Sequence, residues 1–310
     1  GSELPKALAV INHKVYPELE DLQLLSGAGA AFKLSHAFVK YGRENNLGGF
    51  TTRLEEILDY VALGTVADIV PLLGENRIMV KYGIEALQRQ LRPGIRALIE
   101  SSKLRSELTP ADITFRLAPR INAAGRMGQI DLALNLFLTE DEEEAADLAR
   151  KLCDLNRQRQ AVESEIYQQA ISMLPVGQPP EAIVLADESW HQGVVGIVAS
   201  RIAEEYCCPT FLICLDGDHG KASSRSYGGF NLFASLTTLS SLLESYGGHE
   251  LAAGFTISRQ NIDAFREQIC QLASAYSSDD TPRTVLDIDC AITPELLTLP
   301  NVEALNKMEP

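Results

Sequence analysis

The spacing of apolar residues predicts that the first half of the chain is mostly helical. Apolar positions recur with helical spacing around residues 29–42 and 53–63, and again over 74–91, where a Pro-Gly pair ends the pattern. Residues 110–138 also look mostly helical, with an interruption at the stretch RINAAGRMG. The exception is the opening run LPKALAVIN at 4–12, whose apolar character predicts a strand.

A longer helix is predicted over residues 139–174. Thr139 and Glu142 have the spacing of a capping box, and acidic residues in the first turn suit the helix dipole. Apolar residues then follow 4-then-3 spacing, with Arg159 and Gln169 interrupting the seam: Leu148, Leu152, Leu155, Val162, Ile166 and Met173. About 34 helical residues span roughly 50 Å. Such a helix is typical of a connector between domains, although a core helix of one larger domain has the same pattern.

The second half of the chain, residues 181–276, predicts an α/β unit. The apolar runs AIVLA, TFLICL and AAGFTIS predict strands. Helical patterns over 194–206, 231–246 and 261–276 alternate with them. The polar stretch SSDDTPR then predicts a linker, and the tail 284–310 begins with a strand-like run followed by a short helix.

Composition and charge limit the classes of protein that this chain can represent. Its 310 residues are enough for two domains and part of a third, and 45% hydrophobic with 22% charged residues is typical of a globular protein. The net charge of −15 argues against indiscriminate binding to nucleic acid, so any such site must be local. No signal peptide or membrane-length apolar run is visible, and the six cysteines include no C-x-x-C pair. We therefore expect a cytoplasmic protein with no membrane partner.

One aspartate, Asp68, stands in the otherwise apolar stretch GTVADIVPL. A carboxylate in apolar surroundings is costly unless it is hydrogen-bonded, paired or bound to a metal. From the residues alone, two interpretations remain open: Asp68 caps a helix or turn at the end of a buried segment, or it binds a ligand.

The stretch HGKASSRSYGGF is a candidate phosphate-binding segment. Lys221, Ser223 and Arg225 place two cations and a hydroxyl within five residues, with two further serines beside them. Hydroxyl and guanidinium groups are natural donors to phosphate oxygens. The alternative is an ordinary solvated hairpin loop.

Two other glycine-containing stretches offer further candidates. In YGGHELAAGF, Gly247 and Gly248 allow a ligand close to the backbone, and His249 can donate to a phosphate or act as an acid or base. In WHQGVVGIVASRI, Gly193 and Gly196 precede or open a helix, whose first amide groups suit a phosphate. Each of these patterns also occurs in purely structural turns.

Arginines flank a small-residue stretch in APRINAAGRMG. Arg120, Asn122 and Arg126 could all contact a phosphate backbone there. They could equally be helix-capping and surface residues.

Taken in order, seven stretches closely resemble the RecJ family of single-strand-specific DNA exonucleases, within the DHH phosphoesterase superfamily. They are SGAGAAFKL, ALGTVADIVPLLGENR, LAPRINAAGRMG, LNRQRQ, WHQGVVGIVASRI, GKASSRS and GGHELAAGF. The resemblance runs from about residue 4 to residue 258. Seven passages in family order make it specific.

The resemblance implies an α/β fold with two domains joined by a long helix. Residues 1–138 would form the C-terminal part of a parallel-sheet DHH domain, and 139–174 the connecting helix. Residues 175–277 would form the smaller DHH-associated, substrate-binding domain. Residues 278–310 would be a linker and the start of a truncated OB-type domain.

The resemblance also implies a metal-dependent activity on DNA. In the family, two Mn²⁺ or Mg²⁺ ions activate water against a phosphodiester. Asp68 matches a metal-binding aspartate, but the family's Asp-His-His motif is absent from this chain. By the same comparison, Ser223 and Arg225 hold the 5′ phosphate and Arg120 assists them. The chain is therefore expected to be an inactive fragment of a 5′-to-3′ exonuclease of recombination and repair.

The remaining candidates complete a predicted DNA path. Gly247, Gly248 and His249 would line it, with His249 as the catalytic candidate, and Lys221, Asn122 and Arg126 would contact phosphates. The expected partners are single-stranded DNA with a 5′ phosphate, a single-strand-binding protein and a helicase. Two alternatives are a phosphodiesterase for cyclic dinucleotides or very short RNA, and a non-catalytic DNA-binding scaffold.

Overall fold

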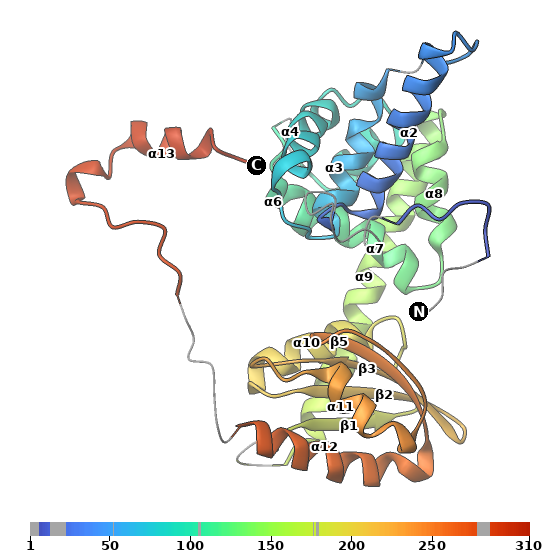
Figure 1. Ribbon diagram of the computed structural model, residues 1–310, viewed down its shortest axis with the longest axis vertical. Coiled ribbons are helices and arrows are strands. Elements are labelled where there is room, and N and C mark those ends of the chain that lie inside the picture. The colour runs from blue at the N-terminus through green and yellow to red at the C-terminus, as the bar shows by residue number, and fades with distance from the viewer. Residues whose placement is uncertain are drawn as a thin grey trace. The chain divides into compact units, whose positions relative to one another are not determined.

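The chain forms two compact units in a computed structural model, which describes residues 6–12, 23–51, 53–104, 107–175, 177, 180–277 and 286–310 (Figure 1). The first unit comprises Gly1–Ala124, Gln129–Asn156 and Ala291–Pro310. The second comprises Gly125–Gly128 and Arg157–Cys290. No helix in the described part of the chain is both long and apolar enough to cross a membrane.

Helices are the only regular secondary structure in the described residues of the first unit. Its helices are α2 (Gly27–Glu44), η2 (Leu54–Ile57), α3 (Leu58–Ala67), α4 (Gly74–Gln88), α5 (Pro93–Ser101), α6 (Pro110–Asp112), the π-helix η3 (Ile113–Leu117), α7 (Ala118–Arg126) and α8 (Ile130–Leu138). Helix α3 is buried along most of its length and packs between α2 and α4. This agrees with its sequence, which is apolar on nearly every side.

Three details of the first unit differ from the sequence prediction. Residues 6–12 form no strand, because no described strand lies beside them to complete their hydrogen bonds. The stretch RINAAGR is not an interruption but lies inside α7, and the chain turns just after it, where Gly128 adopts a φ of +70°. Pro93 opens α5, since proline is well tolerated at the first position of a helix.

The long helix α9 (Glu142–Ser172) contributes residues to both units. The predicted capping box of Thr139 with Glu142 is wrong. Asp141 Oδ1 instead accepts from the Glu144 backbone N–H at 2.7 Å, and Thr139 Oγ1 donates to the Glu144 carboxylate. The capping residues therefore lie two positions further along the chain than the pattern suggested.

The apolar seam of α9 is buried as predicted, except at its end. Leu148, Leu152, Leu155 and Ile166 are all buried, whereas Met173 remains 45% exposed because the helix ends before it. The seam thus packs part of each unit along one helix face.

The second unit is a five-stranded mixed sheet covered by helices on both faces (Figure 1). Its strands are β1 (Ile183–Asp187), β2 (Thr210–Asp216), β3 (His219–Arg225), β4 (Leu243–Gly248) and β5 (Ala252–Ser258), in the order β1-β2-β3-β5-β4. Strand β1 is parallel to β2, and the other pairs are antiparallel. Helix α10 (Val195–Tyr206) and α9 pack on one face; α11 (Leu232–Thr238) and α12 (Ile262–Ser277) pack on the other.

Two further predictions are corrected in and beyond the second unit. The helix predicted over 231–246 ends at Thr238, and residues 243–248 form β4, because Tyr246 pairs with Phe255 across the sheet. The described residues 286–290 form no strand, and the tail contains η6 (Pro294–Leu296) and α13 (Leu299–Asn306).

Candidate phosphate-binding site

Ser223 and Arg225 lie on β3, a central strand, and not in the loop that the sequence suggested. Side chains alternate between the two faces of a strand. Ala222 and Ser224 are buried, and Ala222 belongs to the core under α11 and α12. Lys221, Ser223 and Arg225 therefore share the opposite face, on the side of α10. A strand fixes their relative positions more firmly than a solvated loop would.

Small and hydroxyl-bearing residues continue this face across the neighbouring strands. Ser223 pairs with Gly254 of β5, which pairs with Gly247 of β4. A Cβ atom built on Gly247 would meet no other atom within 4 Å. One row further, Ser245 Oγ donates to Thr256 Oγ1 at 3.2 Å. Because few side chains project from this part of the sheet, a ligand backbone or phosphate can approach the strands closely.

Arg225 is held in place by its own strand and is partly desolvated. Its Nη1 donates to Ser224 O at 2.8 Å and to Ser223 Oγ at 3.4 Å. Burial of the guanidinium lowers the pKa of Arg225, and the positive charge of Arg126 lowers it further. Both causes disfavour the charged form in the absence of an anion.

Arg126 reaches this place from the short segment Gly125–Gly128, which packs with the second unit. Its Nη1 donates to Gly193 O at 3.3 Å, and the adjacent Met127 packs against the core around α10. Desolvation lowers the pKa of Arg126, and the charge of Arg159 lowers it further, while Glu163 acts in the opposite direction. Arg159 itself forms an ion pair with Glu163 on α9.

The charge of Arg126 thus acts on Arg225, and the Ser223 hydroxyl lies beside the Arg225 guanidinium. Within the described part of the chain, no carboxylate forms an ion pair with either guanidinium. Two partly desolvated cations favour a bound anion, because the one carboxylate that acts on Arg126, Glu163, is ion-paired with Arg159. Guanidinium groups also match the geometry of phosphate oxygens. We call the group Arg126, Ser223 and Arg225 the anion site.

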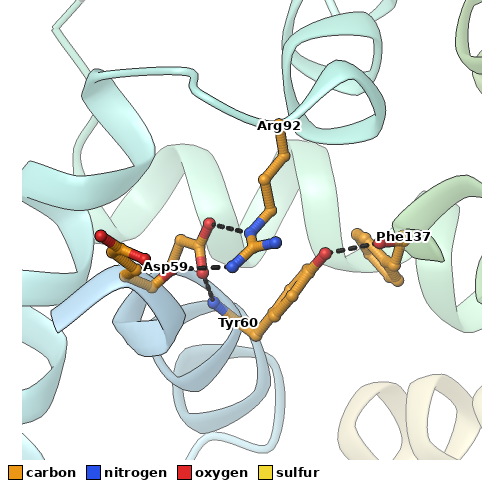
Figure 2. A network of polar contacts seen from close by, with 5 residues as sticks. Asp59, Tyr60, Arg92 and Phe137 are labelled. Atoms are coloured by element: carbon orange, nitrogen blue, oxygen red, sulfur yellow. Dashed lines mark hydrogen bonds and ion pairs between the residues drawn. The ribbon is translucent and has the colours of Figure 1, made fainter. Parts of the chain in front are cut away.

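A second arginine cluster, in the first unit, has the opposite character. Arg92 Nε donates to Asp59 Oδ2 at 2.8 Å, and Arg92 Nη2 donates to Glu56 O at 2.8 Å. The guanidinium also lies 4.4 Å from the centre of the Tyr60 ring. Figure 2 shows that Tyr60 in turn reaches the backbone of Phe137 on α8, where its hydroxyl donates to the carbonyl at 2.5 Å. Because the Asp59 carboxylate is only 7% exposed and fully engaged, this cluster joins helices and leaves no open cation.

His249 closes the turn between β4 and β5. Its backbone N–H donates to Ala252 O at 2.9 Å, and its Nδ1 accepts from the Leu251 N–H at 3.3 Å. The preceding Gly248 has a φ of +137°, which favours glycine. In the neutral ring Nε2 therefore carries the proton and is the nitrogen able to donate to a ligand. A catalytic or DNA-binding role for His249 stays a prediction.

The structure places the candidates Arg120 and Asn122 on α7, in the first unit. Arg120 Nε donates to Cys153 Sγ at 3.3 Å, and its Nη1 donates to Arg116 O. Asn122 is exposed. Their contact with DNA stays a prediction.

Asp68 is exposed at the C-terminal end of α3, so the apolar stretch around it in the sequence does not bury its side chain. Its apolar neighbours on α3, such as Val66, turn inward, while Ile69 on the other side is 79% exposed. The Asp68 backbone N–H donates to Gly64 O at 3.1 Å, which makes the residue a helix C-cap. Within the described part of the chain, no three His, Cys, Asp or Glu side chains gather closely enough to hold a metal ion.

The sequence interpretation missed Arg159 as part of this region. It lies in the seam of α9 and is only 9% exposed, beside the charge of Arg126. The available signal was a cation at an otherwise apolar seam position, which indicates a buried charge with a specific partner.

Known proteins resemble this chain both in one domain and over its full length. Residues 180–275, which include the sheet and the anion-site strand, match the DHHA1 domain. The RecJ single-stranded-DNA-specific exonuclease of Bacillus subtilis is 36% identical over 318 residues, covering 100% of this chain and 38% of that protein.

Solved structures agree with this relationship. The crystal structure of Thermus thermophilus RecJ in complex with Mn²⁺ has a TM-score of 0.85 and 35% identity, covering 100% of this chain and 45% of that one. The corresponding Mg²⁺ complex has a TM-score of 0.78 and 36% identity, covering 92% and 43%. The chain is thus similar in sequence and in α/β fold to part of these RecJ proteins, and it spans less than half of their length.

Proposed function

We propose that this chain is the DNA-binding part of a single-stranded-DNA exonuclease and that its second unit holds the 5′-terminal phosphate. The observation that carries the proposal is the pair Arg126 and Arg225, two neighbouring guanidinium groups without a described carboxylate partner. A 5′-terminal phosphate is a compact dianion that two such groups and the Ser223 hydroxyl can bind together. The named activity of the RecJ relatives supports this substrate class.

The DNA strand would continue from the anion site over the small residues of β5 and β4. Lys221 and Gly247 share the face of Ser223, and Gly248 and His249 follow at the end of β4. All four would contact the following nucleotides. Arg120 and Asn122 of the first unit would add contacts to the sugar-phosphate backbone. Such contacts position a strand without reading its sequence.

The metal ions of the relatives would take part in hydrolysis in the whole protein. RecJ structures are known in complex with Mg²⁺ and with Mn²⁺, and Asp68 is the residue here that would serve as one ligand. The described residues do not fit a complete site, because no second and third ligand lie with Asp68. We therefore expect the 310-residue chain to bind DNA without cleaving it, and the parent protein to act as a 5′-to-3′ exonuclease in repair and recombination.

Fluorescence anisotropy with matched oligonucleotides tests the proposal. The chain should prefer a 5′-phosphorylated single strand over the same strand with a 5′ hydroxyl by about tenfold, since a charge-assisted contact contributes roughly 1.5–3 kcal/mol. EDTA should leave this preference unchanged. With two phosphate-neutralising arginines, the logarithm of affinity should fall with that of salt with a shallow slope of about −1.4. Equal affinity for both 5′ ends would contradict the proposal, and Mn²⁺-dependent degradation of the labelled strand would contradict the inactivity of the fragment.

A further inference from the structure

Glycine at position 196 sets how closely helix α10 approaches the donors of the anion site. A Cβ atom built on Gly196 would lie 2.8 Å from Ser223 Oγ and 3.1 Å from Arg225 Nη2. Both distances are shorter than the optimal separation of non-bonded heavy atoms, which is about 3.5–4.0 Å between carbons. Any larger side chain at this position would therefore displace the hydroxyl and the guanidinium at the same time.

The first turn of α10 also leaves one backbone N–H without an acceptor beside Ser223 and Arg225, among the bonds of the described residues. Its capping residue Val194 provides no side-chain hydrogen bond. The N–H groups of Val195, Ile197 and Val198 are bonded within the turn, to His191 O or Val194 O. Among the backbone bonds of the described residues, none uses the Gly196 N–H. The first turn of a helix has such orphan donors and carries the positive end of the helix dipole, and both favour an anion.

We propose that Gly196 is the specificity-determining position of the anion site. Its missing side chain lets Ser223 and Arg225 lie directly against the first turn of α10. The Gly196 N–H is then a further donor to a terminal phosphate bound beside them. This inference rests on the proposed function and deepens it, because it names the residue that decides whether a 5′ phosphate is accepted. Gly196 is a positioning residue with respect to Ser223 and Arg225.

Gly196 can be tested cleanly because its contacts involve only the ends of side chains. The neighbouring Gly193 provides the contrast, since a Cβ atom there would lie 2.0 Å from the backbone O of Arg126. Substitution of Gly193 must move the main chain. Substitution of Gly196 by alanine moves only the Ser223 hydroxyl and the Arg225 guanidinium, so the fold is retained while the site is changed.

The experiment compares Gly196→Ala with Gly27→Ala in the 310-residue chain. Gly27 is the first residue of α2, and a Cβ atom there would meet nothing within 4 Å, so it is a matched control in the first turn of a helix. Anisotropy is measured with 5′-phosphorylated and 5′-hydroxyl oligonucleotides, and circular dichroism checks the fold. Gly196→Ala should lose most of the preference for the 5′ phosphate, about tenfold. It should bind the 5′-hydroxyl strand nearly as the unmutated chain does, and Gly27→Ala should change neither affinity.

A double-mutant cycle with Ser223→Ala gives a second readout of the same contact, and the double variant lacks the hydroxyl that a Cβ atom at position 196 would meet first. Removing the Ser223 hydroxyl relieves the shorter contact, so Gly196→Ala should cost clearly less preference in that background than in the unmutated one. A folded Gly196→Ala variant that keeps the full preference, or strictly additive effects in the cycle, would overturn the inference. Absence of any preference in the unmutated chain would instead overturn the proposed function, so the two failures are distinguishable.

Discussion

The two arginine clusters of the molecule differ in how their charge is compensated. Arg92 in the first unit lies between the Asp59 carboxylate, a backbone carbonyl and the face of an aromatic ring (Figure 2). Arg225 in the second unit has a hydroxyl and a carbonyl as neighbours, and the nearby charge is that of another cation, Arg126. The charge of Arg92 is compensated within the protein, whereas a bound anion would compensate the charges of Arg225 and Arg126.

This difference separates a structural cluster from a binding site. A buried pair whose lone pairs and protons are all engaged joins elements and offers no attraction to a ligand. Two like charges close together disfavour each other's charged form, as Arg126 does for Arg225, and a bound phosphate would stabilise both. From this comparison we expect Arg92 to support stability, and we propose Arg225 as the residue that binds a ligand.

Breaking the compensated cluster should have the largest effect on folding. Asp59→Ala leaves the partly buried Arg92 without its carboxylate, and we expect the free energy of unfolding to fall by about 3 kcal/mol. Asp263→Ala is the control, because its pair with Arg266 is exposed and should contribute less than about 1 kcal/mol. Urea denaturation of both variants measures this, and equal losses would contradict a special role for the Asp59 cluster.

Arg225→Lys should affect binding and spare the fold. Lysine keeps the charge but cannot copy the two-pronged geometry of guanidinium on phosphate, so the preference for a 5′ phosphate should fall by about tenfold. The matched substitution Arg92→Lys should leave this preference unchanged and lower stability instead. Anisotropy measures the preference and urea denaturation measures the stability of both variants. An Arg225→Lys variant that keeps the full preference for the 5′ phosphate would contradict a bidentate contact of Arg225 with the phosphate.

The smallest effect is expected at Asp68. Because its side chain is exposed at a helix end, Asp68→Asn should change the free energy of unfolding by less than about 0.5 kcal/mol. A loss of 1 kcal/mol or more in urea denaturation would show that the carboxylate supports the fold and is not free to act as a metal ligand.

The sequence predicted most elements of the second unit. The apolar runs at β1, β2 and β5 and the helix α10 lie close to where periodicity placed them, because each is buried on at least one face. The strand β4 was mistaken for helix, since its residues are largely exposed and only pairing with β5 makes them a strand. The apolar pattern of residues 243–248 alone does not reveal this pairing with the following strand.

The role of the candidate site residues stays a prediction, but their place in the fold differs from the one expected from the sequence. Ser223 and Arg225 were expected on a loop, because serine, glycine and arginine are typical of turns, and the burial of Ser224 and Ala222 that makes them a strand depends on the core. The approach of Arg126 to Arg225 joins residues about a hundred positions apart and could not be read from spacing. Gly196 could be noticed in the sequence, but only its contact with Ser223 shows what it does.

The most direct test of the contrast between the two arginine clusters follows the arginine side chains themselves. Nuclear magnetic resonance of the Nε–H groups, assigned through arginine variants, is recorded while a 5′-phosphorylated oligonucleotide is added to the chain. The signals of Arg225 and Arg126 should shift, the signal of Arg92 should stay in place, and the 5′-hydroxyl strand should produce clearly smaller shifts. An Arg225 signal that does not respond to the 5′ phosphate, or responds equally to both strands, would contradict the assignment of the anion site.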